Sequence, residues 1–372
     1  MSLAKMLLEG TASNLTASEA SRYSADEGAA ILAMESAELL QDIFMESECK
    51  ENEIVLNAAL EGYAPDSEIV QEGVGSALKG ALDKVIALFK KLKDGVVAFC
   101  KNIIKYLDKL FLSGKEFVKK YKNELTKKEL DGLTYTRYKY NDDAINAIES
   151  DDVIKGAEEF VYGVAKESLE EANKVLEYGK DKKTKIDSLA AKKNTSAINT
   201  ISSALESNYN KVKEEVRQAK VKFLKEAEVE DINEENPTTS GLSEALLKAF
   251  RGGAESEEDK EELDVDIKES ISIIEKSSSL ISSINSLSSK MTSKFNKGIK
   301  DVEKVQREAD KLGTNNNLSY ISKQIGLYAD SLTFSQNIEN IRLTAWKTVV
   351  NERYKVHTSI VKKALTYKPK KD

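Results

Sequence analysis

The chain contains few of the residues that form crosslinks or metal sites. Its 372 residues include one histidine, His357, and two cysteines, Cys49 and Cys100. Two cysteines do not make a disulfide framework, and their scarcity favours a reducing compartment. His357 has no neighbouring ligand pattern, so these three residues do not predict a metal site.

Signals for membrane insertion and for catalysis are also missing. The sequence has no run of about 18 uncharged apolar residues, so no transmembrane helix is expected. The N-terminus has no basic region followed by an apolar core, as a secretory signal would have. There is no Gly-rich phosphate loop, no Gly-x-Ser-x-Gly and no dinucleotide fingerprint. We therefore expect a protein that is not an enzyme and that needs no cofactor or metal.

Proline is scarce as well, with three residues in the chain, whereas charged residues make up 32% of it. This composition is typical of long α-helices. The clearest helical stretch runs from Val74 to Leu112, where apolar residues recur at steps of three and four and so share one helical face. These residues are Leu78, Leu82, Val85, Phe89, Leu92, Val96, Phe99, Ile103, Leu107 and Leu110. The helix would be roughly 55–60 Å long, and Ser113-Gly114 is expected to end it.

The same spacing predicts further helices over residues 142–179, 181–230, 263–311 and 318–365. We therefore expect an all-α fold of several long amphipathic helices, arranged in antiparallel hairpins or a coiled-coil-like bundle. Residues 133–140 alternate in character and are the best strand candidate, although no partner strand is obvious. A short extended linker is the alternative interpretation of that segment.

These patterns divide the chain into four parts. Residues 1–73 are interpreted as an acidic, weakly structured N-terminal arm and as a candidate removable propeptide. Residues 74–230 would form a helical body, and residues 231–262 a linker or mobile acidic loop. Residues 263–372 would form a C-terminal helical hairpin.

Charge is distributed unevenly between the arm and the rest of the chain. Residues 1–73 carry 15 acidic and three basic residues, a net charge of −12, whereas the remainder carries +5. Lysines on the 74–112 helix and at the C-terminus are candidate contacts to an anionic surface, which could be DNA, lipid or an acidic protein. They are Lys90, Lys91, Lys93, Lys101, Lys105, Lys109, Lys368, Lys370 and Lys371. A solvated, frayed end is the alternative interpretation of the C-terminal lysines.

Glutamate precedes every glycine of the acidic arm. The pairs are Glu9-Gly10, Glu27-Gly28, Glu61-Gly62 and Glu72-Gly73, and none of the other 14 glycines follows a glutamate. Glycine often caps a helix C-terminus, so helix capping is one explanation. Helix ends favour basic residues in the last turn, however, which makes four acidic residues there unexpected. The other explanation is a recognition signal.

The segment Met6-Leu7-Leu8-Glu9-Gly10 resembles the processing sites of tailed-bacteriophage prohead proteins. In that family a protease inside the immature head cuts after Glu in a Leu/Ile-x-Glu pattern, before Gly or Ala. Val70-Gln71-Glu72-Gly73 matches with Val in the first position, whereas the pairs at residues 27–28 and 61–62 depart there. The candidate cleavage residues are Glu9, Gly10, Glu61, Gly62, Glu72 and Gly73.

Three Leu-x-Glu-Ala segments downstream also fit the cleavage pattern. They are Leu169–Ala172, Leu224–Ala227 and Leu242–Ala245. This combination is common in helices, and a folded helix protects its backbone from a protease, so we do not count them as sites.

The resemblance implies a virion structural protein of the internal head or prohead core, located in the virion interior and assembled in the host cytoplasm. Its expected partners are the capsid shell, the prohead protease or further copies of itself, with non-specific contact to packaged DNA. One alternative is a membrane-surface or pore-forming protein, since the 74–112 helix is apolar on one side and lysine-rich on the other. The other alternative is a helical structural adaptor.

Overall fold

The computed structural model describes residues 74–148, 195–312 and 318–368, and the structural statements below concern these residues. The acidic arm, its candidate cleavage residues, and Lys370 and Lys371 lie outside them. Most of the helix predicted over residues 142–179 also lies outside the described part of the chain.

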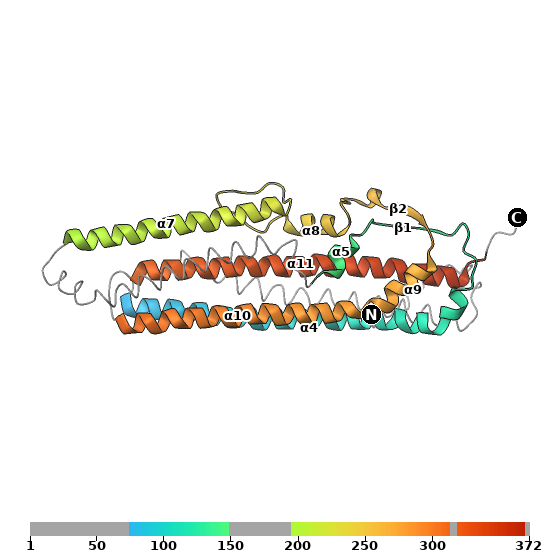
Figure 1. Cartoon of the computed structure of the whole chain (residues 1–372), viewed down its shortest axis with the longest axis horizontal. Coiled ribbons are helices and arrows are strands. Elements are labelled where there is room, and N and C mark those ends of the chain that lie inside the picture. Colours follow the sequence, from blue (N-terminus) through green and yellow to red (C-terminus); the bar gives the residue numbers. More distant parts are fainter. Residues whose placement is uncertain (1–73, 149–194, 313–317, 369–372) are drawn as a thin grey trace, which may run out of the picture.

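Long helices run side by side along the length of the molecule (Figure 1). The most extensive contacts between elements are those of helix α4 with α10 and with α11. Helix α7 also packs against α11, on the opposite side from α4 and α10 (Figure 1). The bounds of the long helices are Val74–Leu125 for α4, Thr195–Glu226 for α7, Ser278–Leu312 for α10 and Leu318–Thr366 for α11. The expected all-α fold of long packed helices is confirmed.

One hydrophobic core joins these helices. Helix α4 buries the predicted apolar face, including Phe89, Leu92 and Ile103, against Phe295 of α10 and Trp346 of α11. Each large apolar side chain that is fully buried contributes about 1.5–3 kcal/mol to stability. The described N-terminal and C-terminal helices therefore share one core.

Helix α11 is the central element, in contact with α4, α7, α8 and α9. It also buries an ion pair, in which Arg342 donates to Glu339 Oε2 through Nε at 3.0 Å and through Nη2 at 2.6 Å. Arg342 Nη1 donates a third hydrogen bond, to the carbonyl of Ile148 at 3.0 Å. Such a pair is retained in a core only because its polar atoms have partners.

A two-stranded antiparallel sheet lies beside the helices. Strand β1 (Thr134–Arg137) pairs with β2 (Glu261–Asp264), with Thr134 opposite Asp264 and Arg137 opposite Glu261. The strand predicted over residues 133–140 is therefore present. Its partner lies in the acidic segment that was expected to be a linker, which explains why the sequence shows no neighbouring partner.

The interpretation of residues 231–262 as a linker or mobile loop is wrong for the part that begins at Leu242. It contains helix α8 (Leu242–Phe250), the 3-10 helix η1 (Glu257–Asp259) and the first residues of β2. Helix α8 packs on α11 and buries Leu242, Leu246 and Phe250. The acidic residues that suggested a loop lie on the exposed side of this packed segment.

Two predicted helix boundaries are also wrong. Helix α4 does not end at Ser113-Gly114 but continues to Leu125, because Gly114 is buried against Tyr354 of α11 instead of capping a helix. The helix predicted over residues 263–311 is two helices, α9 (Ile267–Lys276) and α10. They meet at Ser277, whose hydroxyl donates to the carbonyl of Ile274 at 2.7 Å. A serine that hydrogen-bonds to its own helix backbone often accompanies such a bend.

Candidate functional site

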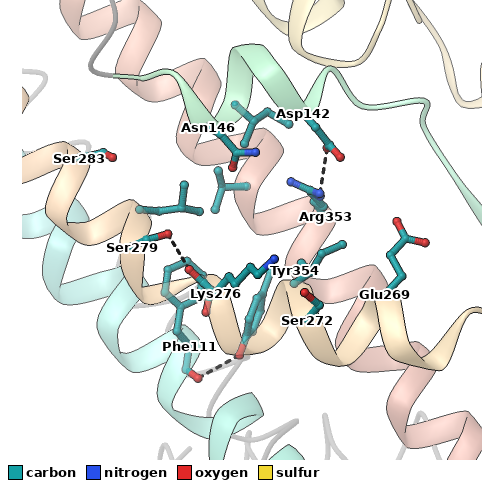
Figure 2. Close-up of a pocket in the computed structure, with 15 residues that line it drawn as sticks. Phe111, Asp142, Asn146, Glu269, Ser272, Lys276, Ser279, Ser283, Arg353 and Tyr354 are labelled. Carbon is teal, nitrogen blue, oxygen red and sulfur yellow. Dashed lines mark hydrogen bonds and ion pairs between the residues drawn. The ribbon is translucent and has the colours of Figure 1, made fainter. Parts of the chain in front are cut away.

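A pocket of about 470 Å³ lies where α5 (Asp142–Asn146), α9, α10 and α11 meet above α4 (Figure 2). This volume is within the range of small-molecule sites. Charged, hydroxyl and apolar side chains all contribute to its walls. The lining residues are Phe111, Asp142, Ile145, Asn146, Glu269, Ser272, Ile273, Lys276, Ser277, Ser279, Leu280, Ser283, Val350, Arg353 and Tyr354.

Helix α5 is a single turn whose position is fixed from both sides. The side chain of Asn141 caps it by accepting a hydrogen bond from the backbone N–H of Ala144 at 3.0 Å. The backbone N–H of Asn141 in turn donates to the carbonyl of Phe250 in α8 at 2.9 Å. At the other end, the indole Nε1 of Trp346 donates to the carbonyl of Ile145 at 2.8 Å. These contacts hold Asp142 and Ile145 at the pocket wall.

Two ion pairs neutralise both carboxylates of the pocket. Arg353 Nη2 lies 2.9 Å from Asp142 Oδ1, and Arg137 Nη1 of β1 lies 3.0 Å from Glu269 Oε1. Burial lowers the pKa of Arg353, and the charge of Asp142 opposes that shift. The Nε atom of Arg353 is buried and has no hydrogen-bond partner in the described part of the chain.

His357 and Ser270 form a buried pair one turn along α11 from Arg353. The imidazole Nδ1 lies 3.0 Å from the hydroxyl oxygen of Ser270, and both side chains are buried. Burial first, and then the charges of Arg353 and Arg137, lower the pKa of His357 to about 3. A serine beside a neutral histidine is the arrangement of a nucleophile with its base. Here both residues are enclosed by the core, so no substrate reaches them, and the pair serves packing.

The candidate lysines of α4 lie largely on its exposed side. Lys90, Lys91, Lys101, Lys105 and Lys109 are exposed, whereas Lys93 is half-buried; Lys368, after the end of α11, is exposed as well. Helical spacing places Lys101, Lys105 and Lys109 on one face. Over its whole length α4 carries twelve lysines against five acidic residues. The exposed lysines Lys90, Lys91, Lys101, Lys105 and Lys109 are called the lysine face below. Their positive charge can attract a polyanion.

Two of the three Leu-x-Glu-Ala segments fall in the described part of the chain. Leu224 lies in the last turn of α7 and Leu242 is the first residue of α8, and both are fully or almost fully buried. A protease that requires this leucine in an extended, accessible segment cannot bind either site in the folded protein. The third segment, Leu169–Ala172, lies outside the described residues.

The described part of the chain contains no cluster of three or more His, Cys, Asp or Glu side chains that could hold a metal ion. None of its helices combines the length and the apolar character needed to cross a membrane. Comparison with family models, with curated proteins and with solved structures finds no significant match to this chain.

The pocket was not predicted from the sequence. Its charged residues Asp142, Glu269, Lys276 and Arg353 come from three helices, and no local spacing connects them. Cys100 is fully buried, and burial raises the pKa of its thiol to about 11.

Proposed function

We propose that this protein is a non-enzymatic virion structural protein of the internal head or prohead core of a tailed bacteriophage. Its acidic arm is removed during maturation by cleavage after glutamate, and the helical body remains in the particle. The Glu-Gly pairs and the charge difference between arm and body are the sequence support for this function.

The observation that carries the proposal is the position of the last Glu-Gly pair. Helix α4 begins at Val74, directly after Glu72-Gly73. A cut after Glu72 would therefore release the whole arm and leave α4 complete. It would remove a net charge of −12 and leave a body of +5, which packaged DNA repels less.

The burial of the downstream segments supports the same proposal. Leu224 and Leu242 are held in the fold, so a Leu-x-Glu protease is expected to spare Glu226 and Glu244. Selective removal of the arm requires that such segments of the body stay protected.

The fold argues against the membrane-surface alternative. A helix that lies on a bilayer inserts its apolar face into the lipid. The apolar face of α4 is buried against α10 and α11, so in this fold it does not face the solvent.

The test is the intact mass and N-terminal sequence of the protein from mature particles, measured beside the full-length recombinant chain. We expect a start at Gly10, Gly62 or Gly73. In a phage carrying Glu72→Gln, cleavage at Gly73 should stop, whereas the matched change Glu244→Gln in α8 should leave processing unaltered. A mature protein that starts at Met1 or Ser2 would overturn the proposal.

A further inference from the structure

Three positive and two negative side chains meet at the pocket between α5, α9, α10 and α11 when Arg137 of β1, which pairs with Glu269, is counted with the lining residues. Each of its two carboxylates is already paired with an arginine, Asp142 with Arg353 and Glu269 with Arg137. The ammonium of Lys276 makes no ion pair with any described residue, although the next carboxylate along α9, Glu275, is bound by Lys122 of α4. Lys276 is therefore the uncompensated charge at this pocket.

Arg353 adds an unused donor at the same pocket. Its Nη2 is bound to Asp142, but its Nε is buried and has no partner among the described residues. A buried N–H without a partner is destabilising, so an acceptor that reached it would stabilise the complex. Figure 2 shows the Lys276 side chain reaching across the pocket toward the wall formed by Arg353 and Tyr354.

The rest of the lining suits a molecule with one polar end. Ser272 and Ser283 present hydroxyl groups at the pocket, and Asn146 presents an amide. Hydroxyl and amide donors complete the coordination of an oxyanion that a lysine or arginine holds. Between them lies an apolar surface made by Phe111, Ile145, Leu280, Val350 and the ring of Tyr354.

We propose that this pocket binds a small amphipathic anion, with a carboxylate or phosphate group at Lys276 and Arg353 and an apolar portion against Leu280 and Val350. The contacts to the anion are charge-assisted, and the partial burial of the site strengthens them relative to the open surface. The proposal concerns the helical body alone and does not depend on processing of the arm.

Trp346 provides a direct signal for binding. It is the only tryptophan of the chain, it is fully buried, and its indole N–H donates to the carbonyl of Ile145, which lines the pocket. The full-length chain would be titrated with 3-phenylpropionate and with phenyl phosphate while tryptophan emission is recorded. We expect a saturable change with at least one anion, and the tighter of the two identifies the preferred head group. The neutral analogue 3-phenylpropanamide should produce no saturable change.

Variants on α9 and α10 separate the proposed site from general effects. Lys276→Gln should weaken anion binding about tenfold, equivalent to about 1.4 kcal/mol. The matched variant Lys268→Gln changes an exposed lysine of the same helix outside the pocket and should bind as the unaltered chain does. Ser283→Leu fills the pocket from α10 and should abolish binding while circular dichroism remains unchanged.

Three results would overturn the proposal. They are the absence of a saturable signal with both anions, equal binding of the neutral amide, and unaltered affinity in Lys276→Gln. Because Lys276 is exposed and makes no ion pair with any described residue, its variant is expected to fold, and a loss of binding there reports on the site itself.

Discussion

At the scale of single residues, the environment of His357 makes the stability of the folded protein depend on pH. The imidazole accepts or donates at Ser270 on α9, lies one turn from Arg353 on α11, and feels the charge of Arg137 on β1. The carboxylates nearby, Glu269 and Asp142, are already paired with those two arginines. Neither carboxylate is therefore left to stabilise a protonated imidazole, and the environment formed by the described residues favours neutral His357.

This environment predicts a loss of stability in mild acid. The pKa of His357 is about 3 in the folded protein and 6.5 ordinarily, so between these values only the unfolded chain binds the proton. Stability contributed by the neutral histidine is present above pH 6.5 and falls below it by about 1.4 kcal/mol per pH unit. Between pH 7 and pH 5, His357→Gln should therefore lose about 2 kcal/mol less than the unaltered chain.

Urea unfolding of both chains at pH 7, 6 and 5, followed by circular dichroism, measures this difference. The carboxylates titrate alike in the two chains, so their contributions cancel in the comparison. Parallel loss of stability in the two chains would show that His357 protonates freely in the folded state. Because this is the only histidine of the sequence, its proton resonances give an independent titration curve.

At the scale of the secondary-structure elements, periodic patterns were predictable and contacts between distant segments were not. The apolar steps of α4 give its buried face correctly, because helical geometry alone determines which residues share a face. The stop assigned to Gly114 was wrong because a local glycine signal contains no information about Tyr354, far along the chain. The pocket was missed for the same reason, since its lining residues come together only when the helices pack.

The crossing of α4 and α11 at Gly114 gives a prediction at this scale. A Cβ at this position would lie 2.2 Å from the hydroxyl oxygen of Tyr354, which donates to the carbonyl of Phe111 at 3.0 Å. Gly→Ala inside a helix ordinarily adds about 1 kcal/mol of stability. Here Gly114→Ala should instead destabilise by about 1–3 kcal/mol, because the packed ring has to move.

A double-mutant cycle tests the cause. Tyr354→Phe alone should cost about 1 kcal/mol through the lost hydrogen bond. In the Tyr354→Phe background the alanine should be tolerated better, so that the double variant is more stable than the sum of the single changes implies. A gain of stability in Gly114→Ala would mean that the two helices are not in close contact at this point.

At the scale of the whole molecule, charge is distributed unevenly between the acidic arm and the rest of the chain. The arm contributes −12 and the rest of the chain +5, and α4 alone carries twelve lysines against five acidic residues. Full-length chain and processed body should therefore differ most in their response to a polyanion. Removal of the arm acts on charge, because it takes away 15 acidic and three basic residues.

The final prediction is that a chain starting at Gly73 binds double-stranded DNA more tightly than the full-length chain at low ionic strength. If the lysine face makes the contact, Lys101→Glu with Lys105→Glu should weaken binding and lower the slope of log affinity against log salt by about two. The matched control is Lys211→Glu with Lys213→Glu, which makes the same change of net charge at exposed positions of α7.

Fluorescence anisotropy of a labelled duplex at several salt concentrations distinguishes DNA contact through the lysine face from an effect of net charge alone. A larger loss in the α4 variant assigns DNA contact to the lysine face, because the two variants differ in the position of the charge and not in its amount. Equal losses would mean that net charge alone governs binding. If the full-length chain binds DNA as tightly as the shorter chain, the acidic arm does not control access of DNA to the body, and the electrostatic reason for its removal fails.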